Sequence, residues 1–149
     1  MDKSKKYIRL CERATEIQQQ WVQGKGDWFV SEDGSLKCCV SGEYESAIIK
    51  NGFRITKNKA GIIRLSRYIW LPRLEQLMEI AQRRGITYGN SAHVFYDWTK
   101  IPYKEPYRLP EKIFLSVEQL WLAFVMQLKY YKKWDGKKWA KLSYSPDIA

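Results

Sequence analysis

The sequence has few of the residues from which metal centres and disulfide frameworks are built. Its 149 residues include one histidine and three cysteines, Cys11, Cys38 and Cys39. Zinc sites commonly take four Cys or His ligands in short-spaced pairs, and this chain has no Cys-x-x-Cys pair. An odd number of cysteines, two of them adjacent, is also a poor basis for disulfides. We therefore predict reduced thiols and no metal site.

Long apolar runs are also missing. The densest apolar stretch, 120–128, is interrupted by Gln127, whereas a transmembrane helix needs about 20 consecutive apolar residues. The N-terminus is basic like that of a signal peptide, but charged residues occupy 7–20, where such a peptide requires an apolar core. We expect a cytoplasmic protein without a membrane partner.

Catalytic motifs are absent as well. The sequence contains neither a Gly-x4-Gly-Lys-Ser/Thr phosphate loop nor a Gly-x-Gly-x-x-Gly dinucleotide motif. His93 would be the only histidine base for a triad, and the nearby Ser91 and Asp97 do not define one, because a triad is a spatial arrangement. We predict no catalytic residue and no cofactor. A nucleotide- or nucleic-acid-processing enzyme with His93, Asp97 and Glu75 as acid–base groups is the third hypothesis for function.

The first half of the chain shows a helical pattern followed by a strand pattern. A helix is predicted over 7–22, where one face is lined by Leu10, Ala14, Ile17 and Trp21. Short β-like runs separated by turn pairs then cover 27–70. The clearest pair is Asn51-Gly52, which suits a two-residue hairpin turn. We predict an antiparallel meander of four to five strands in this region.

The second half is predicted to be mainly helical. A helix is expected over 72–84, with Pro72 in its first turn. A long loop is expected over 86–115, which contains Pro102, Pro106 and Pro110. The last helix is expected over 117–134, after a capping box formed by Ser116 and Gln119. The chain length suits one domain, 1–149, and the element order predicts an α+β fold in which the meander packs with three helices.

Positive charge is concentrated in one part of the sequence. The chain carries a net charge of +10, and its segment 46–74 has no acidic residue. A basic sheet with aromatic rings suits single-stranded nucleic acid, because phosphates bind cations and bases stack on rings. A phosphorylated ligand would fit the same surface, and a solvated basic face is the alternative. The predicted binding residues are Lys50, Arg54, Lys57, Lys59, Arg64, Arg67 and Arg73, with Tyr68 and Trp70 as stacking groups.

A second basic cluster follows the apolar part of the last predicted helix. It comprises Lys129, Lys132, Lys133, Lys137, Lys138 and Lys141. We expect these lysines to coat the carboxyl end of the helix, where cations favour its dipole. The alternative function is a protein–protein module that inhibits or modulates a host protein. Tyr and Trp residues of 86–109, together with Trp134 and Trp139, would be its interface anchors.

Three segments resemble a known group of proteins. They read YIWLPRLEQL at 68–77, SVEQLWLAFVM at 116–126 and KWDGKKW at 133–139. In these segments the chain is similar to small proteins of unassigned function that phages and prophages of Gram-positive bacteria encode. The resemblance implies a phage accessory protein in the cytoplasm of a bacterial host cell, and it transfers no catalytic residue.

Overall fold

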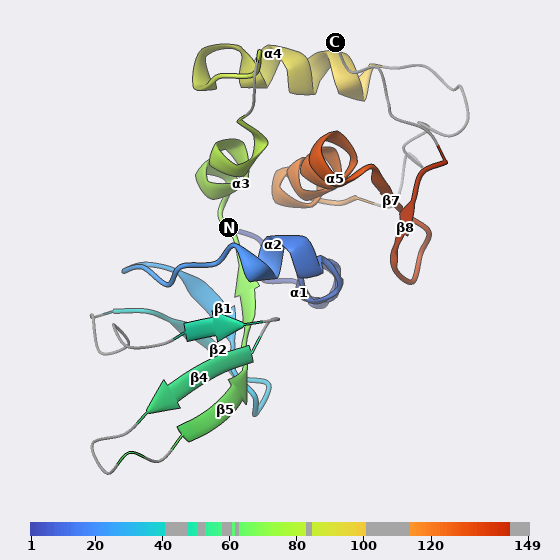
Figure 1. Cartoon of the computed structure of the whole chain (residues 1–149). Helices are drawn as coiled ribbons and strands as arrows, with labels where there is room; N and C mark the ends of the chain where they lie inside the picture. The colour runs from blue at the N-terminus through green and yellow to red at the C-terminus, as the bar shows by residue number, and fades with distance from the viewer. Residues whose placement is uncertain are drawn as a thin grey trace. The chain divides into compact units, whose positions relative to one another are not determined.

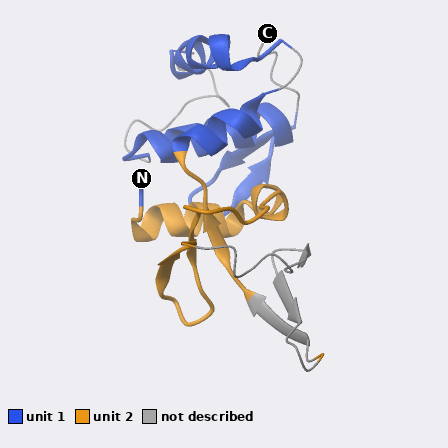
Figure 2. Ribbon diagram, turned by 90° about the vertical axis from the view of Figure 1, so that its left-hand side faces the viewer, with its two compact units in different colours: residues 1–2, 74–149 blue, residues 3–73 orange. Residues whose placement is uncertain are grey.

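The computed structural model describes residues 1–40, 48–50, 53–57, 61, 63–82, 85–100 and 114–143, and for 48–50, 53–57 and 63–66 the backbone alone. The chain divides into two compact units, shown in Figure 2: unit 2 comprises residues 3–73, and unit 1 comprises residues 1–2 and 74–149. Helices and antiparallel strands make up both units, so the α+β class is confirmed. The assignment of 1–149 to one domain stays a prediction. Among the described residues, no helix is long and apolar enough to cross a membrane.

The helix predicted over 7–22 is interrupted. Unit 2 begins with α1 (Lys5–Arg13) and α2 (Thr15–Gln19), shown in Figure 1. Ser4 caps α1, since its hydroxyl accepts a hydrogen bond of 3.1 Å from the Tyr7 N–H. The break falls at Ala14, whose φ of −86° and ψ of 69° are not helical. The predicted apolar face is nevertheless correct, because all four of its residues are buried: Leu10, Ala14, Ile17 and Trp21.

Six strands of unit 2 form two antiparallel sheets of three strands each. One has the order β2-β1-β6, with β1 (Trp28–Val30), β2 (Leu36–Cys38) and β6 (Ile69–Leu71). The other has the order β3-β4-β5, with β3 (Ile48–Lys50), β4 (Phe53–Lys57) and β5 (Ile63–Arg67). The strands predicted on either side of Asn51-Gly52 do pair, with Lys50 opposite Phe53.

The single meander of four to five strands is not confirmed. After Tyr68 the chain leaves the β3-β4-β5 sheet, and β6 pairs with β1, with Trp28 opposite Leu71. Turn residues encode the pairing of neighbouring strands, but the pairing of β6 with β1 joins segments far apart in the sequence. The sequence pattern therefore located the strands without showing which sheet each one joins.

A side-chain amide closes the outer edge of β6. Gln18 is buried, and its Nε2 donates to the Trp70 carbonyl at 2.9 Å while its Oε1 accepts from the Trp70 N–H at 2.8 Å. The same Nε2 donates to the Cys11 carbonyl at 3.1 Å. The amide thus occupies the place of a neighbouring strand and links β6 to α1. Open edges present unpaired backbone groups to further strands, and Gln18 satisfies those of Trp70 here.

The described part of unit 1 consists of three helices and a hairpin. The helices are α3 (Leu74–Ala81), α4 (Tyr88–Thr99) and α5 (Val117–Tyr130), and α5 packs against the other two. Predicted over 72–84, α3 is shorter than expected, and Arg83 and Arg84 lie outside the described residues. The predicted Ser116 cap of α5 is present, because the Ser116 hydroxyl accepts from the Gln119 N–H at 3.2 Å. The Gln119 side chain accepts from the Leu115 N–H at 3.1 Å, in place of the Ser116 N–H that a capping box uses.

Helix α4 lies within 86–115, which was expected to be a long loop. Its start is fixed by the Thr87 N–H, which donates to the Asn90 side chain at 2.8 Å. The buried positions of α4 are Ser91 and Trp98, one helical repeat of seven residues apart. Phe95 lies on the same face, and its ring centroid is 4.5 Å from that of Trp121. A short helical period is therefore present, but the three prolines that follow it favoured a loop over the whole of 86–115.

The last helix ends earlier than predicted. Expected over 117–134, α5 stops at Tyr130, because Tyr131 has a left-handed backbone with φ of 54° and ψ of 45°. The chain continues into the antiparallel pair β7 (Lys132–Trp134) and β8 (Trp139–Lys141). Asp135-Gly136 therefore opens the turn of a hairpin and does not end a helix.

Candidate nucleic-acid interface

Five of the predicted binding residues lie on the β3-β4-β5 sheet, which we call the basic sheet. They are Lys50, Arg54, Lys57, Arg64 and Arg67. In the register of β4 and β5, Arg54 is opposite Ser66 and Thr56 is opposite Arg64. Because successive residues of a strand alternate between faces, Arg54 and Arg64 share one face.

The remaining cations of the basic sheet lie on its other face. Arg67 is opposite Phe53, and Phe53 is opposite Lys50. Lys57 shares this face, since it is four residues from Phe53. Arg67 is therefore on the face opposite Arg54 and Arg64, because it is an odd number of residues from Arg64.

Arg67 is held by a carboxylate of α1. Its Nη2 lies 2.9 Å from Glu12 Oε1, and both side chains are partly exposed. The neighbouring Tyr68 is half-buried and meets the Phe29 ring edge-on, with ring centroids 5.2 Å apart. Part of the positive charge of Arg67 is thus already balanced within unit 2.

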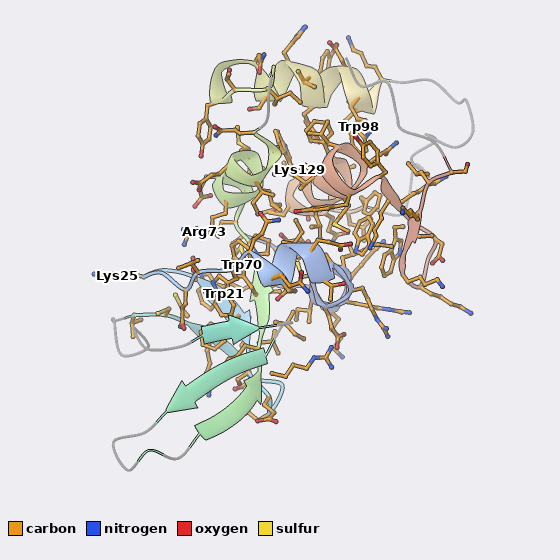
Figure 3. All side chains as sticks on the ribbon, viewed as in Figure 1. Trp21, Lys25, Trp70, Arg73, Trp98 and Lys129 are labelled. Atoms are coloured by element: carbon orange, nitrogen blue, oxygen red, sulfur yellow. The ribbon has the colours of Figure 1, made fainter. Side chains whose placement is uncertain are left out.

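Trp70 belongs to the core of unit 2. Its side chain is 5% exposed, and its ring is stacked on Trp21 with centroids 6.1 Å apart and planes inclined by 3° (Figure 3). A base stacks on a ring only where one face of that ring is open. Trp70 is therefore a packing residue in this structure, in contrast to the predicted stacking role.

Arg73 balances a buried acid. Its Nη1 donates to the Gly26 carbonyl at 2.5 Å and lies 3.9 Å from Asp27 Oδ1. Asp27 is 2% exposed, and its Oδ2 also accepts from the Trp21 indole N–H at 2.9 Å and from the Gly24 N–H at 2.8 Å. Buried charges are normally paired, so Arg73 has a structural role here. Lys59, the remaining predicted cation, lies outside the described residues.

No protein-family model, curated protein or solved structure matches this chain. The resemblance of its three segments to phage and prophage proteins therefore stays an expectation. The function must be inferred from the residues of the chain themselves.

The acid–base candidates lie on exposed helix surface. His93 Nε2 is 3.2 Å from Asp97 Oδ2 on α4, and their side chains are 77% and 58% exposed. Ser91 is fully buried, and its hydroxyl donates to the Tyr88 carbonyl within the helix. Glu75 is exposed on α3. This geometry does not make a Ser-His-Asp triad, and it lends the enzyme hypothesis no support.

The cysteines are not arranged as metal ligands. Cys11 and Cys39 are buried, Cys38 is half-buried, and none of the three is part of a disulfide. In the part of the chain that the structure describes, no group of three or more His, Cys, Asp or Glu side chains is placed to hold a metal ion.

The tryptophans of the alternative hypothesis are mostly core residues. Trp98 is 3% exposed, and Trp134 and Trp139 are similarly buried. Trp98 donates its indole N–H to Gln127 Oε1 at 3.2 Å. Only two of the proposed anchors in the described part of 86–109 are largely exposed, namely Tyr88 and Tyr96 on α4.

A basic hairpin was missed by the sequence pattern. Residues 129–141, the end of α5 and the β7–β8 pair, form what we call the lysine hairpin; it carries six lysines and one acidic residue, Asp135. Lys137, Lys138 and Lys141 are exposed. The signal that could have revealed the hairpin is the Asp-Gly pair between two Lys-Lys-Trp triplets, because Asp-Gly favours the tight turn that joins two antiparallel strands.

Proposed function

We propose that this chain is a non-enzymatic, phage-type accessory protein that binds nucleic acid through the basic sheet. The observation that carries the proposal is the placement of Arg54 and Arg64 on one face of the basic sheet, within a segment, 46–74, that contains no acid. A surface of this kind attracts phosphates and releases their counterions, which gives salt-sensitive binding.

The face that holds Arg54 and Arg64 is the binding face in this proposal. Its other strand positions are Ile49, Thr56 and Ser66, whereas the opposite face also contains Ile48, Phe53, Ile55, Ile63 and Leu65. An antiparallel sheet commonly buries its apolar face and leaves the polar one in water. Two arginines on the polar face would offer planar forks to phosphate oxygens.

Titration with single- and double-stranded oligonucleotides at about 50 mM and about 200 mM salt tests the proposal. The double variant Arg54→Gln/Arg64→Gln should weaken binding and lower the slope of log K against log salt by up to about 2. Lys50→Gln/Lys57→Gln removes the same charge from the opposite face and serves as the matched control, with a smaller loss. Absence of salt-sensitive binding by the unmodified protein near 50 mM salt would exclude nucleic-acid binding.

A protein–protein module is the second candidate, favoured by the exposure of Tyr88 and Tyr96. Their side chains are 53% and 54% exposed, and they lie eight residues apart on α4. Tyrosine is a frequent anchor of interfaces. Under this hypothesis, capture of a host protein would survive nuclease treatment and be lost in Tyr88→Ala/Tyr96→Ala. Recovery of nucleic acid alone would contradict it.

A further inference from the structure

Backbone pairing and a pair of buried rings hold the lysine hairpin in place. Trp134 is opposite Trp139 in register, and the two rings meet edge to face with centroids 5.2 Å apart. Both are buried, at 7% and 6% exposure, so they anchor the hairpin to unit 1. The left-handed Tyr131 aligns β7 after α5, and the Leu142 N–H donates back to its carbonyl at 2.7 Å. These contacts therefore hold the backbone that carries the lysines.

The only acidic residue within 129–141 is Asp135, and it stabilises the turn between β7 and β8. One oxygen of Asp135, Oδ1, accepts from the N–H groups of Lys137 and Lys138, each at 2.8 Å. Lys132 is directly opposite Lys141 in the register of β7 and β8.

We propose that the lysine hairpin is a second polyanion-binding surface, which contacts the phosphodiester backbone of nucleic acid. The inference rests on the proposed function and extends it to a surface in unit 1. Every cation in 109–149 is a lysine, with no arginine. Lysine is a compact point charge without the planar fork that reads carboxylates and bases, so it suits contact with a backbone.

The buried tryptophans limit the type of contact. Because Trp134 and Trp139 face the protein core, the hairpin offers lysines to phosphates and no described tryptophan ring to bases. Binding through this surface should therefore be independent of base sequence, since phosphate contacts position a nucleic acid without reading it.

The test compares two triple variants of the full chain, each missing three exposed lysines. Lys137→Gln/Lys138→Gln/Lys141→Gln removes charge from the hairpin, and Lys5→Gln/Lys25→Gln/Lys100→Gln removes it from scattered sites. With a double-stranded oligonucleotide, the hairpin triple should lower the salt slope by about 2 to 3, and the scattered triple by less than about 1. If the two triple variants lower the salt slope equally, the inference is overturned, because the net charge alone would then explain binding.

Two further measurements separate this inference from the basic-sheet proposal. If Arg54→Gln/Arg64→Gln leaves binding unchanged while the hairpin triple weakens it, the basic-sheet proposal fails and the hairpin inference stands. The reverse result overturns the hairpin inference and keeps the basic sheet. Competition with polyglutamate tests the ligand class, and competition as strong as that of the oligonucleotide would overturn the phosphodiester assignment. Tryptophan fluorescence confirms that each variant is folded.

Discussion

The cations of unit 2 and those of the lysine hairpin differ in their contacts with carboxylates. In unit 2, Arg73 is held by Asp27 and Gly26, and Arg67 is paired with Glu12. In the lysine hairpin, Lys137 and Lys138 are exposed, and the nearby carboxylate of Asp135 is bound to backbone N–H groups. The sequence gives both regions an excess of positive charge. The difference teaches that the position of a carboxylate partner, more than the local sum of charge, decides which cations hold the fold together.

Replacement of Arg73 should have the largest effect. We expect Arg73→Met to lower the free energy of unfolding by about 2 to 3 kcal/mol, because Asp27 would remain buried without its guanidinium. The matched change in the hairpin, Lys138→Met, should alter it by less than about 0.5 kcal/mol, because that side chain is exposed. Urea unfolding followed by tryptophan fluorescence measures both values. Equal effects would remove the distinction between the two regions.

Gly26 offers a second test of the same anchor. Its φ of +86° suits glycine, and an added Cβ would lie 3.0 Å from Arg73 Nη1. Gly34 has a similar φ of +81° with nothing within 4 Å of that position. Gly34→Ala therefore measures backbone strain alone. We expect Gly26→Ala to cost about 1 kcal/mol more in unfolding free energy, through displacement of Arg73. Equal unfolding free energies for Gly26→Ala and Gly34→Ala would show that Arg73 can shift without a loss of stability.

Release of Arg67 should leave binding almost unchanged. Glu12→Gln removes the carboxylate 2.9 Å from its guanidinium, but Arg67 lies on the face of the basic sheet opposite Arg54 and Arg64. We expect affinity for an oligonucleotide at low salt to change by less than about twofold, as it should in the control Glu32→Gln, which removes the same charge from an exposed site. A larger gain in Glu12→Gln than in Glu32→Gln would bring Arg67 into the interface and contradict the assignment of the binding face.

The smallest expected effect concerns pH. The N–H groups of Lys138 and Lys137 lower the pKa of Asp135 below its ordinary value. Because the folded pKa is the lower one, the contribution of Asp135 to the hairpin is complete above about pH 4 and is lost as the pH falls through that lowered pKa. The amide NMR signals of Lys137 and Lys138 should shift only in that acid range. Asp135→Asn should abolish the titration, and a shift near neutral pH would contradict the assignment.

Unit 2 contains a comparable turn that sharpens this test. The hydroxyls of Ser31 and Ser35 lower the pKa of Asp33. The Asp33 turn should therefore also keep its order until the pH falls below about 4. Titration of both carboxylates in one NMR experiment compares hydroxyl donors with backbone donors.

The sequence predicted features that depend on neighbouring residues. The cap at Ser116, the apolar face of 7–22 and the strands flanking Asn51-Gly52 all arise from local chemistry, and each is present. The left-handed Tyr131 was not predictable, because a non-glycine residue in that conformation has no local signal. The apolar stripe of α5 continues in phase from Leu128 to Tyr131, and the first glycine after it is Gly136, so the pattern gave no earlier end to the helix.

The candidate site was less predictable than the fold. Arg64 and Arg67 are three residues apart in β5, so the alternation of side chains along a strand places them on opposite faces. This feature of the candidate site could be predicted from the sequence. The partners of Arg67 and Arg73, however, come from segments far away in the chain, Glu12 and Asp27. The burial of Trp70 likewise depends on Trp21. Tertiary contacts of this kind leave no mark on the charge or hydropathy pattern.

The amide of Gln18 has a consequence for self-association. It occupies the outer edge of β6, so β2 is the other edge of the β2-β1-β6 sheet. A filament grows only if each added copy presents two open edges, one behind and one ahead. Two copies of this sheet that paired through β2 would form a closed dimer, with no open edge for a third copy. Loss of the Gln18 amide would open the edge of β6 and allow further copies to add.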